Sequence, residues 1–268
     1  RAMMDCHTAV LCGVTPGKGG QEAEGRPVFA TVREAITRFP DINTAAVFVP
    51  PFAAKAAILE AIDADIPLIN AIVERIPIQD TAYCLAAAKE KGIRIVGPSS
   101  LGIIAPGVGR IGVVGGPLVD EIFTPGSVGI ISRSGGMTNE LSWQMRRAGL
   151  GQSTVVHVGG DVLMGTTYAD LLRLFERDDQ TKSVAIFGEH GGGYEFEIAD
   201  AIRNREYTKP LAISIGGKFA GVFPEGMTIG HAGAIVGRGQ SAEEKEIALR
   251  AVGVRIADTV EALAGLVL

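Results

Sequence analysis

The sequence predicts an α/β protein in which parallel β-strands alternate with helices in two doubly wound domains. Short continuous apolar runs bounded by Gly or Pro are typical of parallel strands buried on both faces. Such runs lie at 9–14, 45–50, 67–73, 93–99, 127–133, 153–160, 182–189 and 209–217. The 36 glycines of this apolar chain fit many tight loops between strands and helices.

Helices are expected between these strands, at 51–64 and 80–92. A third helix is indicated by apolar residues that recur on one helical face, namely Met137, Leu141, Met145 and Ala148. The alternation of strands and helices pauses at 101–126, which is rich in Gly and Pro and has little helical periodicity. We therefore expect a boundary near residues 124–126, with domains at 1–123 and 124–268.

The beginning of the chain departs from the usual order of a doubly wound domain. Its first residues, RAMMDCHT, have the character of a helix end. Such domains normally open with a strand, a Gly-rich turn and a helix. We expect the opening strand and turn of this domain to be missing from the sequence.

Composition excludes several classes of protein. The net charge of −5 argues against a nucleic-acid-binding protein, which usually carries a basic face. An uncharged apolar run of about 18 residues, as a membrane-spanning helix needs, is absent, and the N-terminus does not resemble a secretion signal. Cys6, Cys12 and Cys84 are too few for a disulfide framework or a metal site, which fits the cytoplasm or a mitochondrial matrix.

A Gly-rich turn, GVTPGKGG at 13–20, follows the first predicted strand. Its glycines permit close approach of the backbone to a ligand, and Lys18 supplies a positive charge. The spacing is not that of a P-loop. A phosphate contact at the carboxyl end of a strand and a flexible surface turn both remain open.

A second Gly-rich turn, SRSGG at 132–136, joins a predicted strand to a predicted helix. Free N–H groups at the positive end of a helix form a potential anion site. The spacing differs from the GxSxG of a hydrolase nucleophile. An ordinary strand-to-helix turn is the alternative.

A third turn, GEHGGG at 188–193, places Glu189 at the carboxyl end of a predicted strand. A carboxylate at this position can orient an imidazole and raise its basicity. A solvated charge at a loop edge is the alternative, and we expect His190 to be a surface histidine.

His231 stands in GHAG, where small neighbours leave room for a group on its ring. Imidazole is a good nucleophile toward phosphoryl groups, and helix N-termini stabilise the negative charge of the product. A structural or solvated histidine is the alternative that the pattern alone leaves open.

Six blocks in the same order resemble the α subunit of the succinyl-CoA synthetase family, within the nucleoside-diphosphate-forming acyl-CoA synthetases that include ATP-citrate lyase. They are GVTPGKGG, RPVFATVREA, GPSSLGIIAPG, SVGIISRSGG, GEHGGG and GHAGAI. The resemblance implies a Rossmann-like CoA-binding domain at 1–123 followed by a flavodoxin-like ligase domain at 124–268. It also implies a small carboxylate substrate and an ATP-grasp β subunit that binds ATP or GTP with Mg²⁺, in an αβ or α2β2 assembly.

The resemblance assigns roles to individual residues. His231 matches the histidine that carries the phosphoryl group, and Glu189 matches the glutamate bound to its ring. Phosphate or substrate would be held by Ser134, Gly135, Gly136, Asn139, Gly191 and Gly192. CoA would be held by Lys18, Pro50, Ile72, Val73, Glu74 and Ser99.

Departures from the family pattern leave other functions open. SRSGGMTNE, with Gly136 and Asn139, is similar to ATP-citrate lyase, so a citrate- or malate-using relative is an alternative. The family's first Gly-rich CoA loop is not found, so a non-catalytic CoA-dependent regulatory subunit is a second alternative. An NAD-dependent dehydrogenase is disfavoured, because GxGxxG does not follow any predicted strand.

Overall fold

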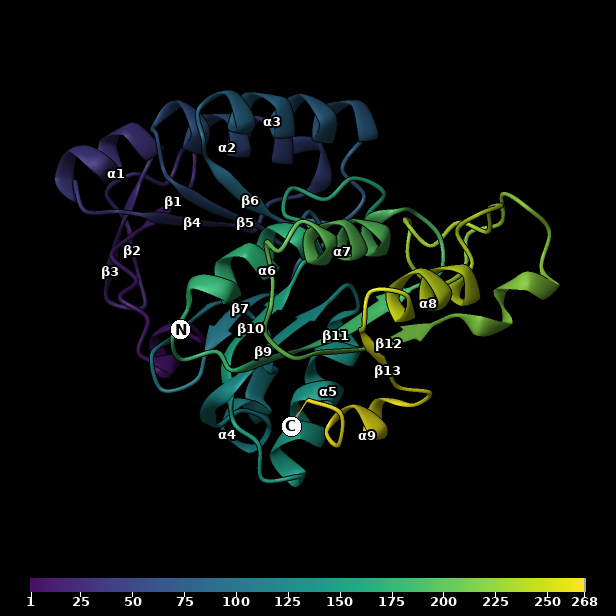
Figure 1. The fold of residues 1–268 in the computed structure, drawn as a ribbon. Coiled ribbons are helices and arrows are strands. Elements are labelled where there is room, and N and C mark those ends of the chain that lie inside the picture. Colours follow the sequence, from purple (N-terminus) through teal and green to yellow (C-terminus); the bar gives the residue numbers. More distant parts are fainter. Residues whose placement is uncertain (268) are drawn as a thin grey trace.

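A seven-stranded sheet runs through the centre of the computed structural model, which describes residues 1–267 (Figure 1). Its strands are β7 (Gly102–Ala105), β8 (Gly109–Gly112), β9 (Pro125–Ser132), β10 (Gln152–His157), β11 (Ser183–Glu189), β12 (Leu211–Gly216) and β13 (Arg255–Ile256). Five of them are parallel neighbours in the order β10-β9-β11-β12-β13, while β7 and β8 extend the sheet by antiparallel pairing beyond β10. Numbered along the chain, the parallel strands stand as 2-1-3-4-5, which is the flavodoxin-like order.

Helices cover both faces of this sheet (Figure 1). On one face lie α6 (Tyr168–Arg177), α7 (Tyr194–Arg203) and α8 (Ala242–Arg250), and on the other α4 (Val119–Ile122), α5 (Gly135–Arg147) and α9 (Val260–Leu263). Two apolar cores result, because parallel strands bury side chains on both of their faces. None of the helices within residues 1–267 is both long and apolar enough to cross a bilayer.

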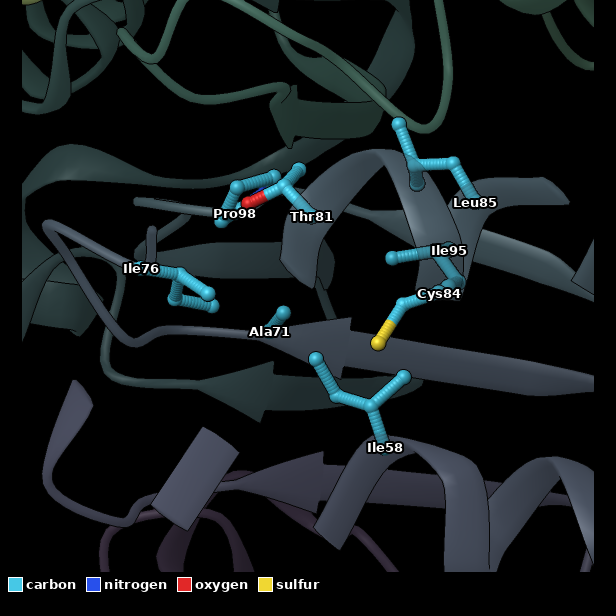
Figure 2. A pocket seen from close by; sticks show the side chains of 8 residues that line it. All are labelled: Ile58, Ala71, Ile76, Thr81, Cys84, Leu85, Ile95 and Pro98. Carbon is cyan, nitrogen blue, oxygen red and sulfur yellow. The ribbon is translucent and has the colours of Figure 1, made fainter. Parts of the chain in front are cut away.

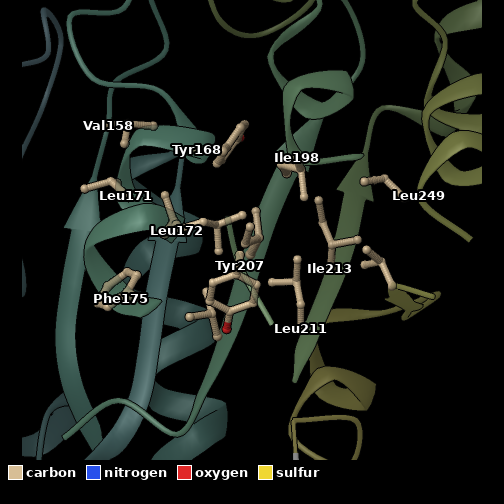
Figure 3. Packing of buried hydrophobic residues seen from close by; sticks show 14 of the residues in the cluster. Val158, Tyr168, Leu171, Leu172, Phe175, Ile198, Tyr207, Leu211, Ile213 and Leu249 are labelled. Carbon is tan, nitrogen blue, oxygen red and sulfur yellow. The ribbon is translucent and has the colours of Figure 1, made fainter. Parts of the chain in front are cut away.

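The core beneath α6 is shown in Figure 3. The helix begins at a capping box in which the Thr167 side chain and the Asp170 carboxylate each accept the other's backbone N–H. Leu172 and Phe175 of α6 pack toward Leu211 of β12 in one buried cluster. This packing holds the helices above the sheet and so fixes the loops at the sheet's carboxyl edge.

A smaller parallel sheet precedes the large one, in the order β4-β5-β6. Its strands are β4 (Thr44–Val47), β5 (Leu68–Ala71) and β6 (Arg94–Val96), and α2 (Pro51–Asp63) and α3 (Ile78–Glu90) pack against it. Pro51 opens α2 at a position where a missing N–H costs no helical hydrogen bond. Strands that alternate with helices in this way form a Rossmann-like unit.

The first forty residues form a third, small sheet (Figure 1). It contains β1 (Gly13–Val14), β2 (Glu22–Ala23) and β3 (Arg26–Phe29), followed by α1 (Val32–Arg38). A single 3₁₀ turn at Met4–Cys6 precedes it, where the sequence indicated a helix end. The strand predicted at 9–14 is wrong in extent, since only Gly13 and Val14 pair.

The predicted α/β class with Rossmann-like and flavodoxin-like parts is confirmed. Residues 101–126, where strands and helices were expected to stop alternating, contain the two strands β7 and β8. These strands were not predicted because they are short and have glycines at the positions where they pair. Gly102 and Gly112 face each other there, and a Cβ on either would collide with the backbone of the other strand. The division into 1–123 and 124–268 stays a prediction, and residue 268 lies outside the described residues.

Leu172→Ala is expected to lower the free energy of unfolding by about 2–5 kcal/mol, because it leaves a cavity in the core under α6. Denaturant unfolding followed by circular dichroism measures the change. Leu174→Ala is the matched control in the same helix, since Leu174 is 43% exposed. Its expected effect is about 0.5 kcal/mol or less, and equal losses in the two variants would contradict the packing described.

Candidate functional site

The carboxyl ends of β9 and β11 meet where the strand order of the large sheet reverses. Ligands of doubly wound sheets bind at such a point, because the loops after the two strands diverge and leave a crevice. Arg133 follows β9 at this place, and Glu189 is the last residue of β11.

His231 is hydrogen-bonded to Glu189, the pairing that the family resemblance implied. The distance from its Nδ1 to Oε2 of Glu189 is 2.6 Å. A carboxylate accepts, so Nδ1 carries the proton and the lone pair of the neutral ring is on Nε2. The hydrogen bond to Glu189 raises the pKa of His231, against the opposing effect of burial. About a third of the side chain, 35%, remains exposed.

The other carboxylate oxygen of Glu189 faces Arg133. Arg133 is only 1% exposed, and its Nη1 lies 3.1 Å from Oε1 of Glu189. The contact does not meet hydrogen-bond geometry, so both atoms are buried in an ion pair without a hydrogen-bond partner among the described residues. Its Nη2 donates to the carbonyl of Asp161 at 2.8 Å. Arg133 was not predicted as a site residue, because within SRSGG it looked like part of a turn.

His231 lies in the segment 217–240, between β12 and α8, which we call the His231 segment (Figure 1). The small residues in this segment and next to it have a steric cause. A Cβ on Gly160 would lie 2.6 Å from Cγ of His231, and one on Gly233 would collide with the guanidinium of Arg133. Gly230 has a φ of +83°, which other residues adopt only under strain. Glycine is therefore needed on both sides of the ring.

A buried ion pair fixes the main chain of Glu189. Lys245 and Glu195 are both fully buried, and Nζ of Lys245 donates to Glu195 Oε2 at 2.5 Å. The same ammonium group donates to the carbonyls of Glu189 and Gly191, each at 2.6 Å. Oε1 of Glu195 accepts the N–H of Glu189 at 3.1 Å. Burial lowers the pKa of Lys245, and the Glu195 carboxylate opposes that effect. Loss of one partner of a buried pair typically costs about 3–5 kcal/mol.

The predicted phosphate-binding residues Ser134, Gly135 and Gly136 begin α5. Ser134 caps the helix by accepting the N–H of Met137 at 3.4 Å. Gly136 faces open space, since a Cβ there would meet no atom within 4 Å. The first N–H groups of a helix lack intrahelical partners and are suited to an anion. Anion binding at this turn stays a prediction.

Other predicted substrate residues already have partners. Oδ1 of Asn139 accepts the N–H of Gly115 at 3.1 Å. The N–H groups of Gly191 and Gly192 donate to the carbonyl and the side-chain oxygen of Gln240, at 2.9 and 3.1 Å. An anion could use these two N–H groups only after displacement of Gln240. Their role in phosphate binding stays a prediction.

The prediction that His190 is a surface histidine is wrong. It is 4% exposed, and its ring packs on Gly217 at the beginning of the His231 segment. Its N–H donates to the carbonyl of Gly216 at 3.1 Å, directly after the end of β11. His190 therefore anchors the base of the His231 segment.

Most of the predicted CoA residues lie along one edge of the small sheet. Pro50 precedes α2 after β4, residues 72–74 follow β5, and Ser99 follows β6. The N–H of Ser99 donates to the carbonyl of Val73 at 2.9 Å, which places the last two stretches side by side. Lys18 is exposed in the turn before β2, outside these three stretches.

One cavity of this part of the chain is too small to hold part of CoA. Figure 2 shows it between α2, α3 and the small sheet. Its volume is about 10 Å³, roughly the space of one water molecule. Its lining residues are Ile58, Ala71, Ile76, Thr81, Cys84, Leu85, Ile95 and Pro98. A ligand of the size of CoA would therefore lie outside this cavity.

Two glycines connect this edge to His231. A Cβ on Gly159 would collide with the carbonyl of Pro98, while Gly160 packs under the His231 ring. Among the charges that raise the pKa of His231, after Glu189, is Glu74 of the small sheet's edge. The structure thus places the predicted CoA edge and His231 on opposite sides of one short glycine loop.

Comparisons with known proteins were made by family models, sequences and solved structures. Residues 1–75 match the model of the CoA binding domain, and residues 125–267 match the succinyl-CoA ligase like flavodoxin domain. The chain is 44% identical to the succinate–CoA ligase [ADP-forming] subunit alpha 2 of Archaeoglobus fulgidus, over 99% of this chain and 89% of that one. It is 41% identical to an ADP-forming sulfoacetate–CoA ligase subunit of Bilophila wadsworthia, over 94% and 85% of the two chains.

A solved structure is also similar. The ATP citrate lyase of Methanosaeta concilii matches with a TM-score of 0.92 and 27% identity, over 99% of this chain. The chain spans less than half of that polypeptide, 46% of its length.

Glu189→Gln is expected to lower the pKa of His231 toward its ordinary value, because it removes the anionic acceptor at Nδ1. Since the pKa of His231 is raised in the folded state, the pair stabilises the fold at low pH. This stabilisation is lost as the pH rises through the folded-state pKa. Titration of the imidazole by NMR measures the shift. Glu206→Gln, which alters a surface ion pair with Arg173, is the control. A His231 pKa unchanged in Glu189→Gln would show that the pair does not form in solution.

Gly160→Ala is expected to push the His231 ring away from Glu189, since the added methyl group would lie 2.6 Å from Cγ. The His231 pKa should therefore fall in the same NMR titration. Gly221→Ala, in the His231 segment but facing open space, should leave it unchanged. Equal behaviour of the two variants would contradict the close packing of Gly160.

Proposed function

Because the chain belongs to the family of succinate–CoA ligase α subunits, the ADP-forming carboxylate–CoA ligases, we propose that His231 carries a phosphoryl group during synthesis of a CoA thioester. The enzyme is an acid–thiol ligase. One observation carries the assignment to His231, namely the 2.6 Å hydrogen bond from its Nδ1 to Glu189.

This hydrogen bond prepares the ring for phosphoryl transfer. With its proton held on Nδ1, the neutral ring presents the lone pair of Nε2 as the nucleophile. Attack by Nε2 on the terminal phosphorus of a nucleoside triphosphate forms an N–P bond and breaks the P–O bond to the diphosphate. The developing positive charge on the ring is stabilised by the Glu189 carboxylate, whose other oxygen faces Arg133.

The phosphoryl group then passes to the substrate. A carboxylate oxygen attacks the phosphorus, which forms an acyl phosphate and returns neutral His231. The start of α5, with Gly136 facing open space, would hold the phosphoryl group or the carboxylate. Its helix dipole would contribute about 1 kcal/mol or less. Arg133 Nη1, which is buried and without a hydrogen bond, is a further donor for this anion.

CoA supplies the thiol that takes the acyl group and releases phosphate. The edge of the small sheet with Pro50, Ile72, Val73, Glu74 and Ser99 would hold it. Phe48 and Phe52, 53% and 86% exposed, lie after β4 and at the start of α2, on the same edge. Exposed aromatic rings beside polar groups suit a ligand with a flat base and an apolar arm. The fit of CoA to this edge thus rests on side chains that the sequence did not single out.

The relatives named above are α subunits or ligase subunits, so a partner subunit is part of this function. We propose that the partner is an ATP-grasp β subunit that brings ATP or GTP and Mg²⁺ to His231 in an αβ or α2β2 assembly. In support, His231 is the exposed member of the Arg133–Glu189–His231 arrangement, open to a group from outside the chain.

The substrate we propose is a small carboxylate with a second anionic group, such as succinate or sulfoacetate. The relatives that act on these two compounds are 44% and 41% identical to the chain, whereas the ATP citrate lyase is 27% identical. Citrate and malate are therefore less favoured. The intact Arg133–Glu189–His231 arrangement supports a catalytic subunit over a regulatory one.

His231→Asn is expected to abolish phosphorylation of the chain, because the amide lacks a nucleophilic nitrogen. Potassium phosphoramidate, which phosphorylates histidine directly, tests the chain alone, and labelled ATP tests the complex with its partner. The label should be lost in acid, retained in base and located on His231 by mass spectrometry. His7→Asn, a change of an exposed histidine, is the control that should label fully. A label that persists in His231→Asn would refute the proposal.

The substrate class is tested with a panel of succinate, sulfoacetate, malate, citrate and itaconate, assayed for CoA-thioester formation by the complex. Succinate or sulfoacetate is expected to give the highest kcat/KM, by about tenfold or more over citrate. Citrate as the best substrate would return the assignment to the ATP-citrate lyase type.

A further inference from the structure

His157 is a buried histidine that the reaction described above does not use. It is the last residue of β10 and is 4% exposed. On the sheet it pairs with Ser132 of β9 on one side and Gly102 of β7 on the other. It therefore stands between the strand that leads to α5 and the loop that follows the small sheet.

Both ring nitrogens of His157 have partners, and these lie on opposite sides of its own strand. Nδ1 accepts the N–H of Leu101 at 2.7 Å, and Nε2 donates to the carbonyl of Arg133 at 2.9 Å. An N–H can only donate and a carbonyl can only accept, so the neutral ring with its proton on Nε2 is the form present. Burial lowers the pKa of His157 to about 4, which keeps this form at neutral pH.

On one side, the ring reaches the loop that bears the CoA edge. Leu101 stands two residues after Ser99, and the hydroxyl of Ser100 donates to the carbonyl of His157 at 2.5 Å. The same hydroxyl accepts from Nδ2 of Asn70, in β5, at 2.9 Å. Buried hydrogen bonds thus run from the small sheet through this loop to His157.

On the other side, the ring reaches the start of α5. Arg133 directly precedes Ser134 and Gly135, and a Cβ on Gly135 would collide with the Leu101 side chain and lie 3.5 Å from Cε1 of His157. The ring and Leu101 therefore form the floor beneath the first turn of α5.

We propose that His157 is a positioning residue that ties the loop of Ser99 to the start of α5, so that CoA and the phosphorylated substrate are held at a fixed separation. The inference rests on the proposed function, because it assigns CoA to one side of the tie and the acyl phosphate to the other. Attack of a thiol on an acyl phosphate requires the two reacting atoms to be held within about 3–3.5 Å, and a misplacement of about 1 Å can cost a hundredfold in rate. Hydrogen bonds from His157 to both binding elements would keep the two reacting atoms at this distance.

A histidine that only fills the core would behave differently. Its loss would lower stability and affect all activities alike. Our proposal predicts that loss of His157 lowers thioester formation more than phosphorylation of His231. Phosphorylation needs only the large sheet, whereas thioester formation needs both sheets in a fixed relative position.

The test uses His157→Leu, which removes both hydrogen bonds, and His157→Gln, whose amide can donate and accept again. In the complex with its partner, the leucine variant should lose about tenfold or more in thioester formation, with a raised KM for CoA. Labelling of His231 by phosphoramidate in the chain alone should stay within about twofold. The glutamine variant should recover part of the thioester activity.

Ser153→Ala is the matched control, because it removes a buried hydrogen bond to Thr181 from the opposite end of β10. At a comparable loss of Tm it should leave the KM for CoA unchanged. The proposal is overturned if His157→Leu retains thioester formation, if phosphorylation falls in parallel with it, or if Ser153→Ala has the same selective effect.

Amide hydrogen exchange keeps this test separate from the proposed function. In the chain alone, His157→Leu should speed exchange at Leu101 and at residues 133–136, and Ser153→Ala should not. Failure of phosphoramidate to label wild-type His231 would refute the proposed function. The exchange rates would still test whether His157 connects the two elements. Unchanged exchange at Leu101 would refute the tie whatever the activity.

Discussion

The buried carboxylate of Glu189 is the constraint on which the site depends. A charge in the interior must be paired, and Glu189 is paired with Arg133 on one oxygen and with His231 on the other. This requirement accounts for the burial of Arg133, for the glycines that make room for its guanidinium and for the imidazole, and for the Lys245–Glu195 pair that holds the main chain of Glu189. Each of these features has a plain structural cause once the carboxylate is in place.

The fold brings these groups together because of where its strands end. Arg133 and Glu189 come from neighbouring strands whose order in the sheet reverses between them, so their loops open away from each other. His231 enters this opening from a segment anchored at both ends, by His190 against Gly217 and by the bonds of Gln240 to the 191–192 turn. The small sheet contributes its own carboxyl edge across Gly159 and Gly160. The two strand edges to which we assign the phosphoryl carrier and CoA thus face one loop.

Local patterns in the sequence predicted every strand of the two parallel arrangements except β13, and the helices α2, α3 and α5. They failed where the determining contact is distant in the sequence. Arg133 looked like a turn residue because its partner lies 56 residues further along the chain, and Lys245 is the same distance from Glu189. Strands β7 and β8 were missed because glycine, required where the two backbones cross, is a turn signal when seen alone. The family resemblance supplied roles for single residues and the contact between Glu189 and His231, but none of the other contacts that hold them.

The side-chain oxygen of Gln240 accepts the N–H of Gly192 and so occupies the 191–192 turn. Inorganic phosphate from solution would have to displace this amide oxygen before it could bind to the same N–H groups. Part of its binding free energy would be spent on breaking the hydrogen bonds of Gln240. A phosphoryl group attached to the His231 ring would have a far higher effective concentration at the turn, and would therefore displace the amide more readily than free phosphate. If the turn binds phosphate as predicted, the side chain of Gln240 would thus favour phosphate attached to His231 over dissolved phosphate.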